Sequence, residues 1–287
     1  MPKVVSIHSY RGGTGKSNFT ANLATTVALQ GHRVGVIDTD LPSPGIHNLF
    51  CLEPEQIDNA LNHYLWGEAP IESVAYDVSA KVGISSSASN GNHPDNNNLD
   101  NNNPDNNNSD NNSLNNNKGA GSGQLFLVPA SVKADDIARI LKDGYDVKLM
   151  NDGFRQLVKT LKLDYLFIDT HPGLSKETFL SIAISHVLLL ILRPDKQDYQ
   201  GTAVTADVAR QLKVRKMLLA INKVYSSLNV DALKQKVEET FHETVAGVFP
   251  LSEDVVQLAS EGVFCVKYPE HPVSQEFRKV AQQIAEA

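Results

Sequence analysis

Apolar and polar positions along the chain follow two alternating periods. Short runs rich in β-branched and other apolar residues, typical of buried strands, are separated by longer segments whose apolar residues recur at helical spacing. Strands that alternate with helices in this way predict an α/β fold with a mostly parallel sheet and helices on both faces. The predicted strands cover residues 4–9, 33–38, 125–128, 165–169, 187–192, 217–222 and 245–249.

The first helical segment has the clearest pattern. Phe19, Leu23 and Val27 recur at helical spacing, and Gly31 supplies a stop signal before the second strand. Residues 4–38 are therefore expected to form a strand, a loop, a helix and a second strand, the order that opens a Rossmann-like fold.

Residues 85–123 break this pattern. From Pro94 onward, Asn and Asp fill a five-residue repeat that lacks the apolar central residue of a β-helix coil. Because such a segment cannot bury a core, we predict a disordered insertion that interrupts a single domain spanning residues 1–287. We interpret the insertion as a dispensable loop rather than a functional element.

The charge balance argues against a surface coated with basic residues. The chain has 26 Lys and Arg residues against 33 Asp and Glu, and its formal net charge is −7. Any binding to DNA must therefore come from a local basic patch. Cys51 and Cys265 have neither metal-site spacing nor the density of a disulfide scaffold, so both are expected to be buried apolar residues in a reducing compartment.

The sequence offers no signal for secretion or for stable membrane insertion. Its start lacks the apolar region of a signal peptide, and its longest apolar run, residues 187–192, is far shorter than the roughly 20 residues of a spanning helix. We therefore expect a cytoplasmic protein.

The candidate chemistry begins in the loop after the first strand, which reads Gly-Gly-Thr-Gly-Lys-Ser. Small residues let successive backbone amides turn toward phosphate oxygens, and the following helix adds its positive end. Lys16 is expected to reach the β and γ phosphates of a nucleotide, and the Ser17 hydroxyl to bind Mg²⁺. A glycine-rich turn before a helix is common, but the full Gly-Lys-Ser ending between a strand and a helix favours nucleotide binding. The residues predicted to contact the nucleotide here are Gly12, Gly13, Thr14, Gly15, Lys16, Ser17 and Asn18.

Acidic residues end two further predicted strands. Asp38 and Asp40 follow the second strand, and ligands bind at this end of an open parallel sheet, so Asp38 is expected to face the phosphates and orient an attacking water. The alternative is a pair of solvated loop acids. Asp169 is placed to hold the metal ion, and Gly173 lets a backbone amide approach the γ phosphate. The predicted metal-binding residues are Ser17, Asp38 and Asp169.

These three segments, in this order, resemble the ParA/MinD family of deviant Walker ATPases. The family's loop reads Lys-Gly-Gly-x-Gly-Lys-Ser/Thr, its next strand ends Asp-x-Asp, and its Walker B segment reads Asp-Thr-Pro-Pro. The likeness covers nearly all of the chain outside the Asn-rich segment. It implies that ATP and Mg²⁺ are the ligands, that Asn222 contacts the adenine and that Pro250 lies against it.

Two positions depart from the family pattern. His171 stands where the family usually has proline, and we interpret it as a tolerated loop histidine. Arg11 replaces the lysine that reaches across a dimer to the partner subunit's nucleotide, and this change resembles the carboxysome-positioning McdA branch. The resemblance implies a homodimer formed with ATP that binds nucleoid DNA without sequence preference. It also implies a McdB-like adaptor that stimulates hydrolysis and links the ATPase to cargo.

Binding of this kind requires Lys and Arg side chains that face DNA phosphates rather than bases. Basic residues gather at the end of the helix predicted between the strands at 187–192 and 217–222, and near the C-terminus, although a solvated surface is the alternative at each position. The candidates are Arg210, Lys213, Arg215, Lys216, Arg278 and Lys279.

Two residues compete as the cation that relieves repulsion between the nucleotides of a dimer. Arg11 occupies the family position and offers a planar fork for phosphate, but it is bulkier than lysine. Lys148 lies on the outward side of a predicted helix whose buried face carries Met150, Phe154, Leu157 and Leu161. We favour Lys148, because the resemblance is to a branch whose loop lacks the lysine; a solvated Lys148 is the alternative.

Two other functions stay open at this point. A membrane-surface ATPase of MinD type would carry an amphipathic basic helix at its C-terminus, but Phe277, Val280 and Ile284 form a stripe with only two basic residues beside it, which favours core packing. A metabolic relative is the other, either an iron–sulfur electron donor or a small-molecule ligase. The position of Cys265 near the end of the chain argues against the donor, and the sequence reveals no substrate pocket for a ligase.

Overall fold

A computed structural model describes residues 2–84 and 123–287 and contains one eight-stranded sheet in the order β3-β4-β2-β5-β1-β6-β7-β8. Every neighbouring pair is parallel except β3 and β4, which run antiparallel. The strands are β1 (Lys3–His8), β2 (Arg33–Asp38), β3 (Tyr76–Asp77), β4 (Gln124–Val128), β5 (Tyr165–Asp169), β6 (Val187–Leu192), β7 (Lys216–Val224) and β8 (Thr244–Pro250).

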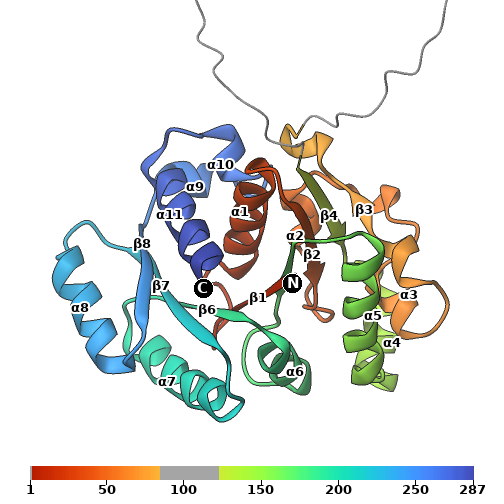
Figure 1. The fold of residues 1–287 in the computed structure, drawn as a ribbon, viewed down its shortest axis with the longest axis horizontal. Helices are drawn as coiled ribbons and strands as arrows, with labels where there is room; N and C mark the ends of the chain where they lie inside the picture. The colour runs from red at the N-terminus through yellow and green to blue at the C-terminus, as the bar shows by residue number, and fades with distance from the viewer. Residues whose placement is uncertain (1, 85–122) are drawn as a thin grey trace, which may run out of the picture.

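Helices cover both faces of this sheet (Figure 1). Their bounds are α1 (Lys16–Leu29), α2 (Ile46–Leu49), α3 (Leu61–Leu65), α4 (Ala134–Asp143), α5 (Val147–Thr160), α6 (Lys176–Ile184), α7 (Lys196–Gln211), α8 (Val230–Phe241), α9 (Glu253–Gln257), α10 (Phe264–Lys267) and α11 (Pro272–Glu286), with 3₁₀ turns at Pro54–Gln56, Ile71–Val74 and Ala80–Val82.

The predicted α/β fold is confirmed, and each predicted strand is present within two residues of its expected ends. Within residues 2–84 and 123–287 the structure adds one strand, β3, whose two residues are too few to leave a periodic pattern. Residues 85–122, which hold the predicted disordered insertion, lie outside the described residues. Among the residues that are described, no helix is long and apolar enough to cross a membrane.

Side chains alternate between the two faces along each strand, as the pleat requires. In β1, Val5 and Ile7 join the core beneath α1 and α11, whereas Val4 packs with the cluster beneath α5 and α6. A third cluster packs α7 and α8 against β6, β7 and β8. Because the strands are buried on both faces, they read in the sequence as continuous apolar runs rather than as alternating ones.

The prediction that both cysteines are buried is wrong for one of them. Cys265 is buried, but Cys51 is exposed. Cys51 has a left-handed backbone (φ 51°) directly after α2, and its carbonyl accepts a hydrogen bond from Lys81 Nζ at 2.7 Å. The residue belongs to a surface turn, so its apolar character does not bring it into the core.

Three aromatic rings join the C-terminal helix to the rest of the core. Phe19 of α1, Phe249 of β8 and Phe277 of α11 have ring centroids 4.5, 5.1 and 4.7 Å apart, in edge-to-face and tilted arrangements. Val280 and Ile284, the remaining members of the predicted stripe, have no exposed surface. In this structure the stripe of α11 is therefore part of the core, in agreement with the interpretation from the sequence that it serves core packing.

Replacing Phe277 with alanine removes a buried ring and should lower the melting temperature by on the order of 10 °C, since such truncations cost about 3–5 kcal/mol. Gln282→Ala, on the exposed side of the same helix, is the matched control and should melt near the wild type. Differential scanning calorimetry of the two variants makes the comparison, and an unchanged Phe277→Ala transition would contradict a core role for the stripe.

Candidate nucleotide-binding site

The loop between β1 and α1 adopts a conformation that only glycine accommodates easily. Gly13 and Gly15 have φ values of 73° and 107°, in the left-handed region. At Gly15 space is also short, because a Cβ atom there would lie 2.7 Å from Nδ2 of Asn222. The two glycines therefore fix the path of the loop.

The backbone N–H groups of this loop are free to bind a ligand. Within the described part of the chain, the N–H groups of residues 12–15 donate no hydrogen bond to a protein acceptor. The loop leads directly into α1, a helix of 14 residues whose N-terminus carries partial positive charge. Unpaired donors at a helix N-terminus form an anion-binding cradle.

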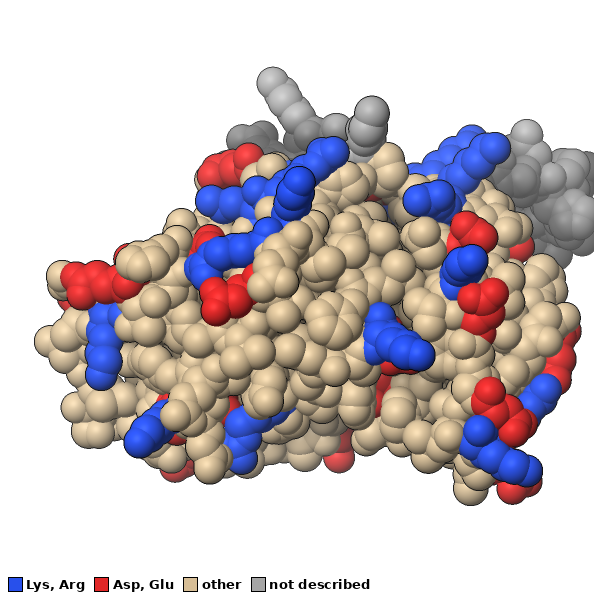
Figure 2. All heavy atoms as spheres, turned by 90° about the horizontal axis from the view of Figure 1, so that it is seen from below, with Lys and Arg blue, Asp and Glu red and all other residues tan. Residues whose placement is uncertain are grey.

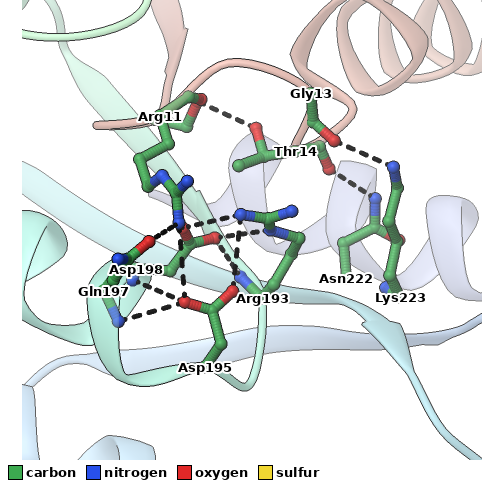
Figure 3. Close-up of polar contacts among 10 residues, drawn as sticks. Arg11, Gly13, Thr14, Arg193, Asp195, Gln197, Asp198, Asn222 and Lys223 are labelled. Atoms are coloured by element: carbon green, nitrogen blue, oxygen red, sulfur yellow. Dashed lines mark hydrogen bonds and ion pairs between the residues drawn. The ribbon is translucent and has the colours of Figure 1, made fainter.

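The carbonyl groups of the loop, in contrast, are held by the end of β7 (Figure 3). Asn222 Nδ2 donates to the Thr14 carbonyl at 2.7 Å, and Lys223 Nζ donates to the Gly13 carbonyl at 2.8 Å. On the inner side, the Thr14 hydroxyl donates to Ser9 Oγ at 2.8 Å. Sequence reasoning missed Lys223, whose only signal is its place next to Asn222.

A buried cation and two buried carboxylates lie behind the loop. Lys16 is 7% exposed, and Asp38 and Asp169 are each 1% exposed. The parallel register of β2 and β5 places Asp38 directly beside Asp169. Burial lowers the pKa of Lys16 below its ordinary value. The carboxylates of Asp169, Asp40 and Asp38 act in the opposite direction but do not cancel this effect.

The two carboxylates differ in their partners. Asp38 accepts backbone N–H bonds from Asp40 at 3.0 Å and Gly45 at 3.3 Å, yet burial and the charge of Asp169 raise its pKa well above the ordinary range. Burial likewise raises the pKa of Asp169 to about 6, against a hydrogen bond from Ser17 and the charge of Lys16. Thr20, a residue that sequence reasoning missed, donates from its hydroxyl to Asp169 Oδ1 at 3.0 Å.

This pair of carboxylates fits a divalent cation that would neutralise it. Ser17 and Asp169 are close enough to hydrogen-bond, so the predicted set of oxygen ligands comes together. The described residues contain no group of three or more His, Cys, Asp or Glu side chains that could hold a metal ion alone. Magnesium typically uses one or two carboxylates together with substrate phosphates, which matches this arrangement.

The segment after β5 is tied back to the site. His171 Nδ1 lies 2.7 Å from Asp40 Oδ1, so His171 has a specific acidic partner and is more than a tolerated loop residue. Gly173 has a φ of 82°, but its N–H donates to the Ser9 carbonyl at 3.3 Å. The amide that was expected to approach the γ phosphate is thus engaged with the protein in this structure.

A buried histidine at the end of β1 adds an unused acceptor. The Thr170 hydroxyl donates to the Ile7 carbonyl at 2.8 Å, so it must accept from His8 Nδ1 at 2.7 Å. His8 Nε2 then carries no proton, and no partner for it exists among the described atoms. Burial, with the charges of Lys16 and His171, lowers the pKa of His8 to about 3, so the ring is neutral. Nothing in the sequence indicated this role, because His8 lies within an apolar run.

An apolar pocket opens beside the loop, where the adenine was expected. Asn222 and Pro250, the two residues expected at the base, both line this pocket. The amide of Asn222 is fixed because its Oδ1 also accepts from the backbone N–H of Lys223 at 2.8 Å. The pocket lining includes Asn18, Phe19, Asn222, Phe249, Pro250 and Val255.

The two candidate bridging cations have different surroundings. The Arg11 side chain is 40% exposed, and its guanidinium contacts the N-terminal turn of α7 in its own chain. Lys148 is exposed at the start of α5, where its backbone N–H donates to the N-cap carboxylate of Asp146 at 2.8 Å. As predicted, Met150, Phe154 and Leu157 are buried on the opposite side of this helix, whereas Leu161, the fourth residue of the predicted face, lies at the helix C-cap and is half-buried.

The six candidate DNA-binding residues are all exposed, but they fall into two groups. Arg210, Arg278 and Lys279 form ion pairs with acidic residues of their own chain. Lys213, Arg215 and Lys216, at the junction of α7 and β7, form none within residues 2–84 and 123–287. On the face in Figure 2, acidic and basic side chains are interspersed around a broad uncharged area, so that face presents no extended basic surface among the described residues.

Comparison with known sequences shows which family of proteins this chain resembles. Residues 5–264 match the model of the CobQ/CobB/MinD/ParA nucleotide-binding domain. An uncharacterized ATP-binding protein of Methanocaldococcus jannaschii is 21% identical over 99% of this chain and 88% of its own length. A cytosolic Fe-S cluster assembly factor of Neurospora crassa is 28% identical over 75% of this chain, which spans only 56% of that relative's length.

Solved structures agree with the fold. The cell division ATPase MinD of Pyrococcus furiosus superposes with a TM-score of 0.73 at 20% identity, covering 100% of this chain and 99% of that one. MinD of Pyrococcus horikoshii in complex with Mg-ADP gives 0.72 at 19% identity, with 99% and 96% covered. Apo McdA of Cyanthece gives 0.69 at 14% identity, with 99% and 100% covered. The family model extends over most of the chain and includes the loop, both buried aspartates and the base pocket, so the protein belongs to the CobQ/CobB/MinD/ParA nucleotide-binding domain family.

Proposed function

We propose that this protein binds and hydrolyses ATP as a single-domain ATPase of ParA type. The observation that carries the proposal is the set of unpaired N–H groups at residues 12–15, directly before a buried Lys16. The cradle and the ammonium group together suit a polyphosphate, and the apolar pocket at Asn222 and Pro250 suits a base.

Ser17, Asp169 and Asp38 would hold Mg²⁺, whose chemistry is to neutralise charge on the phosphates. Thr20 would help orient the Asp169 carboxylate, because its hydroxyl lies 3.0 Å from Asp169 Oδ1, although the Lys16 carbonyl at 3.0 Å competes for the same proton. Asp38, fixed by two backbone N–H groups, would orient the attacking water. Lys16 holds the phosphates against the loop.

At a finer level, we propose an ATP-dependent homodimer that binds DNA non-specifically and positions cargo, carboxysomes in the first instance, through a McdB-like adaptor. Arg11 in place of the loop lysine and the similarity to McdA support this choice. The best-placed DNA contacts are Lys213, Arg215 and Lys216. Within the part of the chain that the structure describes, these side chains form no ion pair with an acidic residue, so their charges are available to DNA phosphates. Location at the nucleoid would follow.

A second candidate is a role in Fe-S cluster assembly, favoured by the similarity to the Neurospora crassa factor. Clusters are usually held by four cysteine thiolates, and this chain has two cysteines, of which only Cys51 is exposed. A cluster would therefore have to be shared between copies. Anaerobic reconstitution with iron and sulfide, compared with Cys51→Ser, tests this candidate directly.

Co-sedimentation with random-sequence DNA and with anionic liposomes, each in ADP and in ATP, tests the proposed function. The wild type should sediment with DNA in ATP only. Lys16→Ala should lose ATP binding and, with it, DNA binding, because the phosphates lose their buried counter-charge. ATP-dependent DNA binding that survives in Lys16→Ala would refute the loop assignment, and sedimentation with liposomes alone would favour a MinD-type membrane-surface ATPase.

Asp38→Asn should keep ATP binding but reduce steady-state hydrolysis by on the order of 10²-fold or more, since an amide cannot accept the proton of the attacking water. The variant should accumulate as an ATP-bound dimer. Phosphate release and nucleotide binding are measured on the same preparation, with Asp77→Asn on the exposed side of β3 as the control. Normal turnover in Asp38→Asn would eliminate the water-orienting role.

Arg11→Ala and Lys148→Ala separate the two candidate bridging cations. If Lys148 bridges, as we propose, its loss should abolish ATP-dependent dimers in sedimentation velocity, whereas Arg11→Ala should still dimerise. Loss of the dimer in Arg11→Ala alone would assign the bridge to the loop arginine. Dimers in both variants would argue against a bridging cation at either position.

A further inference from the structure

Arg11 does not point freely into solvent. Its guanidinium lies over the first turn of α7, where Nη1 donates a short hydrogen bond to Gln197 Oε1 (Figure 3). The same nitrogen lies 3.9 Å from Asp195 Oδ1 and 3.8 Å from Asp198 Oδ1. The first residue of the phosphate loop is thus held by a different element of its own subunit.

Asp198 is the buried centre of this contact, with 2% of its side chain exposed. A buried carboxylate needs a partner, because an unpaired one is costly. Arg193 supplies it fully: Nε donates to Oδ2 at 2.9 Å, Nη2 donates to Oδ1 at 3.1 Å, and the backbone N–H adds a third bond at 2.9 Å. Asp198 therefore stays satisfied whether or not Arg11 is present.

Asp195 has its own fixed role. Its carboxylate caps α7 by accepting the N–H groups of Gln197 at 3.1 Å and Asp198 at 3.0 Å. Its contact with Arg11 is long and 40% exposed on the arginine side, and exposed contacts of this kind contribute little. Among the described residues, the hydrogen bond to the neutral Gln197 is the shortest side-chain contact of Arg11, whereas the buried Asp198 carboxylate, already paired with Arg193, lies 3.8 Å away.

We propose that the first turn of α7 is a holding site for Arg11 that competes with nucleotide phosphates, and that Gln197 is the positioning residue that sets this competition. The inference rests on the proposed function, since it needs a nucleoside triphosphate in the loop. Arg11 leaves the turn when the phosphates attract its guanidinium, and the Arg193–Asp198 pair stays behind unbroken. The planar fork of arginine suits both partners, because it can meet an amide oxygen or two phosphate oxygens.

Removing the Gln197 side chain should free Arg11 to contact nucleotide phosphates and should leave the Arg193–Asp198 pair intact. Gln197→Ala should therefore tighten binding of Mg²⁺ with adenylyl imidodiphosphate by about three- to tenfold, the range expected for one hydrogen bond. Gln197→Glu should weaken binding, because it adds a charge that holds Arg11. Isothermal titration calorimetry measures both, with Gln200→Ala, an exposed glutamine one helical turn along, as the control.

The same substitutions in an Arg11→Ala background decide whether the effect acts through Arg11. In that background Gln197→Ala should change the affinity no further, whereas a purely structural role of Gln197 would produce equal effects in both backgrounds and overturn the inference. Wild-type affinity in Gln197→Ala would overturn it as well. If the wild type itself binds no nucleotide, the proposed function fails, and this inference fails with it.

Discussion

The site depends on the burial of two carboxylates side by side. Asp38 and Asp169 end adjacent parallel strands in register, and neither is more than 1% exposed. Burial raises the pKa of both carboxyl groups, and the charge of Asp169 raises that of Asp38 further, so ionising both is unfavourable without a nearby cation. Lys16 meets part of this requirement, and a divalent ion with its phosphates would meet the rest. This unmet charge is the physical argument for proposing that the site binds Mg²⁺ together with a nucleotide.

The other half of the site is held in place by the far edge of the sheet. Asn222 and Lys223 at the end of β7 bind the loop carbonyls, and Phe249 in β8 packs against Phe19 of α1. The base pocket lies between these two contacts. Packing in the C-terminal third of the chain thus determines the geometry of a loop at its beginning, so core substitutions far along the sequence can reach the nucleotide.

The sequence was sufficient for the strands and for the residues of the loop because both leave local signals. Buried parallel strands are continuous apolar runs, and a phosphate loop needs glycine at fixed places. It could not predict Lys223, Thr20 or Gln197, because their roles come from distant elements that meet only in the fold. Cys51 was misassigned for a related reason: residue type says little about burial in a turn. The pairing of His171 with Asp40 also joins segments more than a hundred residues apart.

The approach of α7 to the loop links these observations. Gly201, one turn after Gln197, lies so close to Tyr10 that a Cβ atom would come within 2.1 Å of the ring. Tyr10 directly precedes Arg11, so the helix touches the loop at two successive residues, once by packing and once by a polar contact. Since the Arg193–Asp198 pair keeps the turn intact, the loop arginine can change partners without loosening the helix that holds it.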